Sequence, residues 1–174
     1  SNLDELHGCE GFTRDHQFRN VAAALALQPL VGTYLYASAY RYEDCFVRGQ
    51  QAHLTHWDPV LLPNLSTERL RILSVGGQYS RVQKTERVAT FPLSHRYLHV
   101  CVSSTGSRNC STCWKCARTL LTLELLGQLE TYREAFDLKA YAVVRSRYIV
   151  EMLRSEEPLW AEIRELARVR GHQF

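Results

Sequence analysis

The spacing of four cysteines constrains this chain more than any other feature of its sequence. Cys101, Cys110, Cys113 and Cys116 follow the pattern C-x8-C-x2-C-x2-C, and the other two of the six cysteines lie far upstream. Two residues between cysteines allow a tight turn to direct neighbouring thiolates at one point, and the more distant Cys101 can supply the fourth corner of a tetrahedron. The intervening SSTGSRN is polar and short-sided, so packing alone would hold it poorly. We predict that a metal ion holds this loop.

Three interpretations of these thiols stay open. Four protein ligands without an open position are typical of a structural zinc site. An iron–sulfur cluster also accepts a C-x2-C-x2-C run with a fourth cysteine, and buried thiols or a redox pair are the simplest alternative. Zinc is favoured because the ligand set is complete. We expect Lys115 and Arg118 to compensate the negative charge that a zinc ion with four thiolates carries.

The cysteine region resembles a known family. Residues 109–119 read NCSTCWKCART, which is similar to the N-C-x-x-C-x-K-C-x-R-T signature in the C-terminal parts of PP-loop proteins. These are the ATP-pyrophosphatases, or adenine-nucleotide alpha-hydrolase-like proteins, and they include relatives of 7-cyano-7-deazaguanine synthase. Residues 80–84, SRVQK, resemble the S-R-x-x-K segment that precedes the cysteines there. The similarity covers residues 30–127. It implies a Rossmann-like sheet, a zinc ion bound by the four cysteines, and Asn109 and Lys115 as neighbours of that ion.

This sequence departs from the family at the ATP-binding loop. PP-loop enzymes adenylate a substrate, and a glycine-rich Ser-Gly-Gly-x-Asp-Ser loop holds the leaving pyrophosphate through its backbone N–H groups. The nearest fragment, Gly76 to Ser80, lacks the aspartate. The resemblance therefore implies the C-terminal portion of a longer enzyme, with ATP binding only when an N-terminal half is present. No catalytic residue can be named, and we do not expect this chain alone to be active.

A second candidate site lies upstream of the cysteines. Ser80 is a good N-cap for a helix over 80–89, and Arg81 and Lys84 lie one turn apart at its start. Two cations near a helix N-terminus oppose the helix dipole unless an anion lies there. We therefore interpret Ser80, Arg81 and Lys84, with Arg118 behind them, as contacts for a nucleotide or a small anionic substrate. The alternative is an ordinary solvated helix face.

The order of predicted elements divides the chain into two parts. Residues 1–127 are predicted to form the C-terminal portion of an α/β nucleotide-hydrolase-like core that includes the zinc knot, 101–116, and residues 128–174 a helical extension packed on it. The predicted elements are a helix over 17–27, a strand over 33–38, a helix or strand over 70–75, a helix over 80–89, a strand over 97–102, a buried helix from 116 to Gly127, and helices over 129–136, 138–153 and from 158 onward.

Composition narrows the classes of function. A net charge of +3 is too small to indicate nucleic acid as a partner, and no apolar run is long enough to cross a membrane. Clustered cysteines favour a reducing compartment, so we expect a cytoplasmic protein. The sequence is also compatible with a homo-oligomer. The alternatives in function are a zinc-dependent module that binds protein or nucleic acid through its helical C-terminal third, and an iron–sulfur protein.

Overall fold

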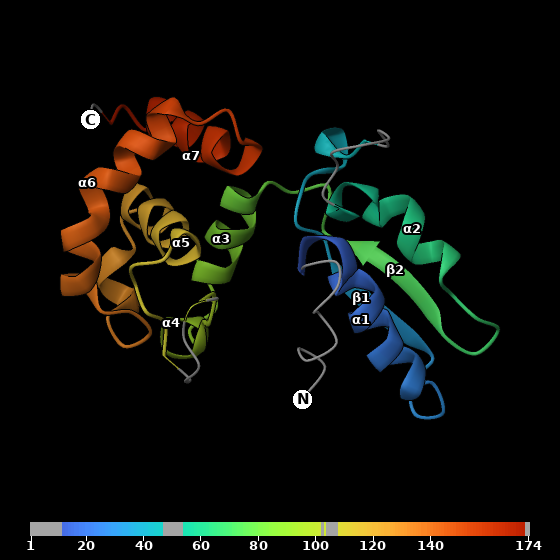
Figure 1. The fold of residues 1–174 in the computed structure, drawn as a ribbon. Helices are drawn as coiled ribbons and strands as arrows, with labels where there is room; N and C mark the ends of the chain where they lie inside the picture. The colour runs from blue at the N-terminus through green and yellow to red at the C-terminus, as the bar shows by residue number, and fades with distance from the viewer. Residues whose placement is uncertain (1–11, 47–53, 102, 104–107, 173–174) are drawn as a thin grey trace. The chain divides into compact units, whose positions relative to one another are not determined.

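The computed structural model describes residues 12–46, 54–101, 103 and 108–172, with side chains described from residue 16 onward. It is a mixed α/β structure, mostly helical, with one short parallel sheet. The chain divides into two compact units, residues 1–79 and residues 80–174 (Figure 1). The division therefore falls at Tyr79 and Ser80, whereas the sequence pattern suggested a boundary after residue 127.

Unit 1 contains helices α1 (Phe12–Ala26) and α2 (Asp58–Asn64), strands β1 (Thr33–Ala37) and β2 (Arg71–Val75), and the short 3-10 helices η2 (Tyr42–Asp44) and η3 (Leu54–Trp57). The two strands pair in parallel, from Thr33 opposite Arg71 to Ala37 opposite Val75. The predicted strand over 33–38 is confirmed, and the ambiguous segment over 70–75 is a strand.

Alternation along β1 explains how the small core of unit 1 forms. Tyr34 and Tyr36 point to one face of the sheet, where they pack with Val21 of α1, Leu62 of α2 and Ile72 of β2. The residues between them are exposed, and Leu35 keeps 59% of its surface accessible. One face of this sheet is thus covered by both helices, as expected for a strand with a period of two residues.

A buried acid in unit 1 sets a pH dependence. Asp58 is 1% exposed at the start of α2, and its Oδ1 accepts a hydrogen bond of 3.1 Å from Nε2 of the fully buried Gln17. The same amide donates to Thr55 Oγ1 at 3.2 Å, and His16 lies 3.4 Å from that hydroxyl. Burial raises the pKa of Asp58 from 3.8 to about 6, and the bond from Gln17 offsets part of the effect.

We expect the stability of unit 1 to fall as the pH rises from about 4 to about 6. Between these values the folded chain holds a proton on Asp58 that the unfolded chain has released, so raising the pH favours unfolding. Asp58→Asn should remove this loss, which we expect to be on the order of 1–2 kcal/mol. Urea unfolding of both proteins at several pH values measures it. Glu68→Gln, at an exposed acid, is the control, and identical pH profiles for wild type and Asp58→Asn would contradict the expectation.

Unit 2 is helical and is built around α5 (Trp114–Leu125), of whose 12 residues seven are buried. Figure 1 shows α5 lying among α3 (Arg81–Ala89), α6 (Leu138–Arg154) and α7 (Pro158–Val169), with α4 (Ser94–Tyr97) and the 3-10 helix η4 (Leu129–Tyr132) at one end. The largest side chains in this core include Leu120, Tyr132, Tyr141, Met152 and Trp160. Helices on both sides of residue 127 share this one core, which is why no division occurs there.

Local sequence signals fix most helix ends in unit 2. Gly127 adopts a φ of +70°, and its N–H and that of Gln128 bond to the carbonyls of Glu124 and Leu123, so the chain leaves α5 through a glycine turn. Asp137 Oδ1 accepts from two N–H groups at the start of α6, and Pro158 is the first residue of α7. The predicted helices over 138–153 and from 158 are confirmed, and that over 129–136 is shortened to η4.

Candidate metal centre and adjoining pocket

The four predicted cysteines converge on one point. Their Sγ atoms all lie within 4.8 Å of one another, and those of Cys101 and Cys113, and of Cys110 and Cys116, are each 3.9 Å apart. None of the four forms a disulfide bond. A tetrahedral ion with zinc–sulfur bonds of about 2.3 Å requires sulfur–sulfur distances of about 3.8 Å. The cluster could therefore hold one metal ion, and the predicted convergence is confirmed.

Helix α5 positions two of the sulfurs. Cys113 is the residue before its first turn and Cys116 lies within that turn, so the helix begins inside the knot, earlier than predicted. Backbone N–H groups support the other sulfurs: those of Ser103 and Cys110 donate to Cys101 Sγ at 3.3 and 3.4 Å, and that of Cys113 donates to Cys110 Sγ at 3.3 Å. Such bonds stabilise thiolates, the form that binds metal.

The thiols differ in acidity. Burial opposes the ionisation of Cys110, but hydrogen bonds from the backbone of Thr112 and Cys113 outweigh it and lower its pKa to about 6. Burial, followed by a hydrogen bond with Cys113, raises the pKa of Cys116 far above its ordinary value. A metal that binds all four sulfurs must therefore displace protons, chiefly from the buried one.

Asn109 fastens Cys101 to the rest of unit 2. The segment 98–101 is not a strand, contrary to the prediction for 97–102, of which Val102 lies outside the described residues. Instead Asn109 Oδ1 accepts from the N–H groups of Val100 and Cys101 at 2.9 and 3.1 Å. Its Nδ2 donates to the carbonyls of Leu98 and Ala135 at 2.8 and 2.9 Å. One buried amide thus satisfies the backbone groups that a neighbouring strand would have paired. Asn109 also lies next to the cysteines, as the resemblance implied.

Two further contacts dock the knot on the helices. Ser111, fully buried with a φ of 62°, accepts a hydrogen bond of 2.8 Å from the N–H of Asp137. The hydroxyl of Tyr148 on α6 donates to the carbonyl of Thr112 at 2.9 Å. The knot is therefore part of the unit 2 core and not a separate appendage.

Lys115 and Arg118 lie between the knot and a pocket. The guanidinium of Arg118 stacks 4.4 Å above the ring of Trp114, lies 5.7 Å from the ring of Trp160, and pairs with Glu157 at 3.3 Å. Desolvation, and then the charges of Arg118 and Arg81, lower the pKa of Lys115, while the Cys113 thiol raises it. Positive charge is thus concentrated beside the cysteines, as the sequence predicted.

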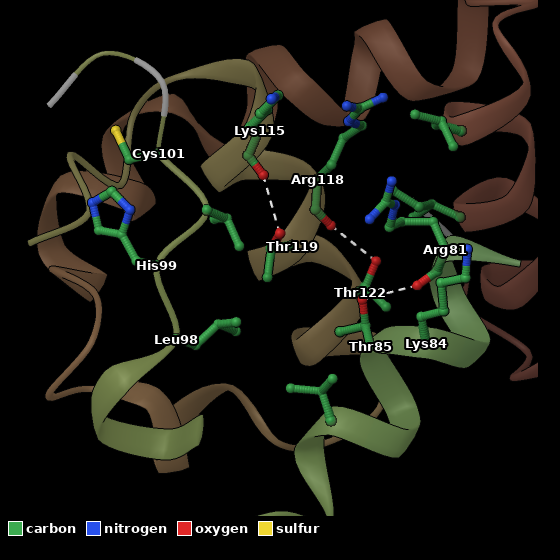
Figure 2. Close-up of a pocket in the computed structure, with 14 residues that line it drawn as sticks. Arg81, Lys84, Thr85, Leu98, His99, Cys101, Lys115, Arg118, Thr119 and Thr122 are labelled. Atoms are coloured by element: carbon green, nitrogen blue, oxygen red, sulfur yellow. Dashed lines mark hydrogen bonds between the residues drawn. The ribbon is translucent and has the colours of Figure 1, made fainter. Parts of the chain in front are cut away.

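The pocket has a volume of about 430 Å³. Figure 2 shows α5 between α3 and the segment 98–101, and residues of all three, together with two from α7, line the cavity. The predicted cations Arg81, Lys84 and Arg118 all line it, and so do Lys115 and Cys101. No Asp or Glu occurs among its described lining residues. The structure thus brings three of the four predicted anion contacts and one cysteine of the cluster together in one cavity.

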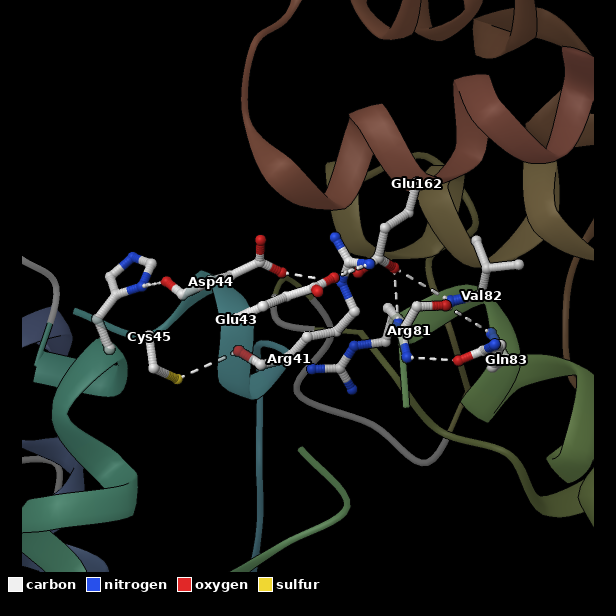
Figure 3. A network of polar contacts seen from close by, with 10 residues as sticks. Arg41, Glu43, Asp44, Cys45, Arg81, Val82, Gln83 and Glu162 are labelled. Atoms are coloured by element: carbon white, nitrogen blue, oxygen red, sulfur yellow. Dashed lines mark hydrogen bonds and ion pairs between the residues drawn. The ribbon is translucent and has the colours of Figure 1, made fainter. Parts of the chain in front are cut away.

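Ser80 has a different place. It is not among the residues that line the pocket; its Oγ accepts from the N–H of Gln83 at 3.0 Å, and Gln83 Oε1 accepts from the N–H of Ser80 at 2.9 Å. This is a capping box, so the predicted N-cap is confirmed. The anion at this helix end is Glu162 of α7, whose Oε2 accepts from the N–H groups of Arg81 and Val82 at 2.6 and 3.3 Å (Figure 3).

Sequence reasoning missed several residues of the site. Glu162, which occupies the start of α3, and Leu159 and Ile163, which line the pocket, come from a helix about 80 residues away in the chain. No local signal marks them, because they look like ordinary members of an amphipathic helix. Asn109 was assigned to the metal's surroundings, but its four hydrogen bonds could not be read from spacing.

Comparison of the chain with protein-family models, with curated proteins and with solved structures found no match. The described helices include none that is both long and apolar enough to cross a membrane. The site's own geometry is therefore the basis for a functional hypothesis.

Proposed function

We propose that unit 2 is a zinc-stapled module that binds a small anionic substrate beside its metal. Zinc suits the cluster because four thiolates close a tetrahedron of the right size and leave no position for a redox or catalytic ligand. An iron–sulfur cluster fits less well, since its cysteines bind different iron atoms and their sulfurs lie farther apart than around a single ion. In this role the metal is structural: it holds the segment 98–101 and the start of α5 together.

The observation that carries the binding function is the charge of the pocket. Four cations line a cavity of about 430 Å³, a size typical of small-molecule sites, without an acidic residue among the described lining. Concentrated positive charge near low-dielectric walls attracts anions. The sources of this charge are the first turns of α3 and α5, so the ligand's anionic end would lie between these helix starts.

Replacing Lys84 by methionine is expected to weaken the binding of inorganic phosphate to the zinc-loaded chain by about fivefold to tenfold, because one cation of the pocket is lost. Calorimetry at two salt concentrations measures the affinity, which should fall as salt increases. Lys139→Met, at an exposed lysine of α6 that does not line the pocket, is the matched control and should leave binding unchanged. Equal loss in both variants, or no phosphate binding by the wild type, would contradict the proposal.

We further propose that the chain is the C-terminal portion of a PP-loop, adenine-nucleotide alpha-hydrolase-like protein, to which unit 2 contributes substrate-side contacts. Support comes from the signature over 109–119, whose cysteines converge in space, and from the parallel pairing of β1 and β2 next to helices, which suits part of a Rossmann-like sheet. The exposed Leu35 on β1 suits a sheet with a second layer, because parallel sheets are usually covered on both faces. The five cysteines among the described residues form no disulfide bond, which suits the cytoplasm.

ATP binding tests this family assignment. This chain should bind ATP no more tightly than it binds inorganic phosphate, because its sequence lacks the glycine-rich loop with its aspartate. The protein translated from the complete reading frame, including any residues upstream of Ser1, should bind ATP in calorimetry. A complete protein without affinity for ATP would contradict the assignment, and steeply salt-dependent binding of RNA or DNA would favour an interaction module instead.

A further inference from the structure

The residues that line the pocket in unit 2 fall into three chemical groups, which we call its cationic, threonine and aliphatic walls. Together these groups define the chemistry of the ligand more closely than its negative charge alone. One wall is cationic, formed by Arg81, Lys84, Lys115 and Arg118. A second consists of the hydroxyl groups of Thr85, Thr119 and Thr122, and a third of aliphatic side chains (Figure 2). We propose that the pocket takes a small organic phosphate, a phosphomonoester whose apolar body carries N–H or O–H groups. This inference rests on the proposed binding of an anionic substrate and names its class.

The cationic wall favours phosphate over a simple carboxylate. Two arginines and two lysines line the cavity, whose described lining includes no Asp or Glu, although Arg118 also pairs with Glu157 at 3.3 Å. A phosphomonoester carries close to two negative charges at neutral pH and offers three acceptor oxygens, so it can contact several of these donors at once. A monocarboxylate has one charge and two oxygens, so it can contact fewer of these donors at once.

The threonine wall accepts hydrogen bonds and does not donate them. Each hydroxyl donates a hydrogen bond to the carbonyl one helical turn earlier: Thr85 to Arg81 at 2.9 Å, Thr119 to Lys115 at 3.1 Å, and Thr122 to Arg118 at 2.9 Å. A hydroxyl whose proton is directed at a backbone carbonyl presents only its lone pairs to a ligand. These three groups therefore select a ligand with donors of its own, and they disfavour phosphate oxygens on this side of the cavity.

The aliphatic wall calls for an apolar body. Val88 of α3, Leu98 and Val100 of the irregular segment, and Leu159 and Ile163 of α7 also line the cavity. Inorganic phosphate would leave this surface in contact with water, whereas a ligand with a ring or a branched chain would cover it. Burial of that apolar area adds affinity that the charge alone does not supply.

Calorimetry of the zinc-loaded full chain with four probes tests the proposal. Phenyl phosphate should bind about tenfold more tightly than inorganic phosphate because it covers the aliphatic wall, and benzoate should bind more weakly than phenyl phosphate. Among 2-, 3- and 4-aminophenyl phosphate, at least one isomer should gain about fivefold over phenyl phosphate through a bond to a threonine. Thr119→Val or Thr85→Val should remove this gain.

Thr90→Val is the matched control, since Thr90 also donates to a backbone carbonyl, that of Arg87 at 2.8 Å, but does not line the pocket. Metal content and circular dichroism of each variant establish that it is folded. If phenyl phosphate binds no tighter than inorganic phosphate, or benzoate binds as tightly as phenyl phosphate, the proposed ligand class is overturned while anion binding stands. If no aminophenyl phosphate gains affinity, the role of the threonines is overturned. If none of the anions binds, the proposed function itself fails.

Discussion

Replacing Cys116 by serine is expected to abolish stoichiometric metal binding and to destabilise unit 2 on the order of 5 kcal/mol. The Cys116 sulfur is fully buried in the first turn of α5, within 4.8 Å of the other three. Zinc contributes about 10–16 kcal/mol of apparent binding free energy in zinc-finger peptides, while a whole domain has a net stability of about 5–15 kcal/mol. A serine hydroxyl is a poor ligand for zinc, so most of the metal's contribution would be lost.

Elemental analysis of protein purified without added metal, together with thermal unfolding, measures both effects. We expect one zinc ion per wild-type chain and none in Cys116→Ser. Cobalt substitution adds a spectroscopic test, because tetrahedral thiolate coordination gives intense absorption bands. Cys45→Ser is the control: Cys45 lies in unit 1, where its thiol donates to the carbonyl of Arg41, and its loss should leave the metal content unchanged. A wild-type protein that contains no metal and is no more stable than Cys116→Ser would overturn the metal site.

Replacing Asn109 by alanine is expected to cost about 2–4 kcal/mol and to lower the affinity for zinc. The buried Asn109 amide serves the N–H groups of Val100 and Cys101 and the carbonyls of Leu98 and Ala135. Alanine would leave these groups without that partner, and the segment that carries Cys101 would lose its attachment. The binding of zinc would then have to order this segment, and the entropy lost in doing so reduces the net free energy of zinc binding.

Competition with a chromophoric chelator measures the zinc affinity, and urea unfolding of the zinc-loaded proteins measures the stability. Asn64→Ala is the matched control, because the exposed Asn64 bonds only the carbonyl of Val60 in its described side-chain contacts and should cost less than about 1 kcal/mol. Asn109→Asp should fall between alanine and wild type, since it keeps an acceptor but loses both donors. Unchanged zinc affinity in Asn109→Ala would contradict the role assigned to this amide.

Local features were predictable from the sequence because their causes are local. The capping box at Ser80, the proline at the start of α7 and the β-favouring residues of β1 each act within a few residues. The cysteine cluster was predictable for another reason: ligand spacing has few geometric solutions once four sulfurs must meet. These signals located the metal site and three cations of the pocket.

Features that depend on distant parts of the chain were not predictable. Alternation over 97–102 indicated a strand, but no neighbouring strand is present among the described residues, and Asn109 satisfies the backbone instead. The two cations at the start of α3 indicated an anion there; the structure places the carboxylate of Glu162, supplied by tertiary packing, on the backbone N–H of Arg81. Residue 127 separates two helices in sequence although both contribute to one core, and no local signal marks the division at Tyr79 and Ser80.

Segment 98–101 belongs to the cysteine cluster and to the pocket at once: it ends in Cys101, and its residues form part of the lining of the cavity. The proposed zinc ion and the proposed phosphate ester are therefore thermodynamically linked. If the binding of one orders segment 98–101, the binding of the other loses less conformational entropy. By reciprocity, the factor by which zinc strengthens phosphate-ester binding must equal the factor by which the ester strengthens zinc retention. The rate at which a chelator strips the ion would then report how full the neighbouring cavity is.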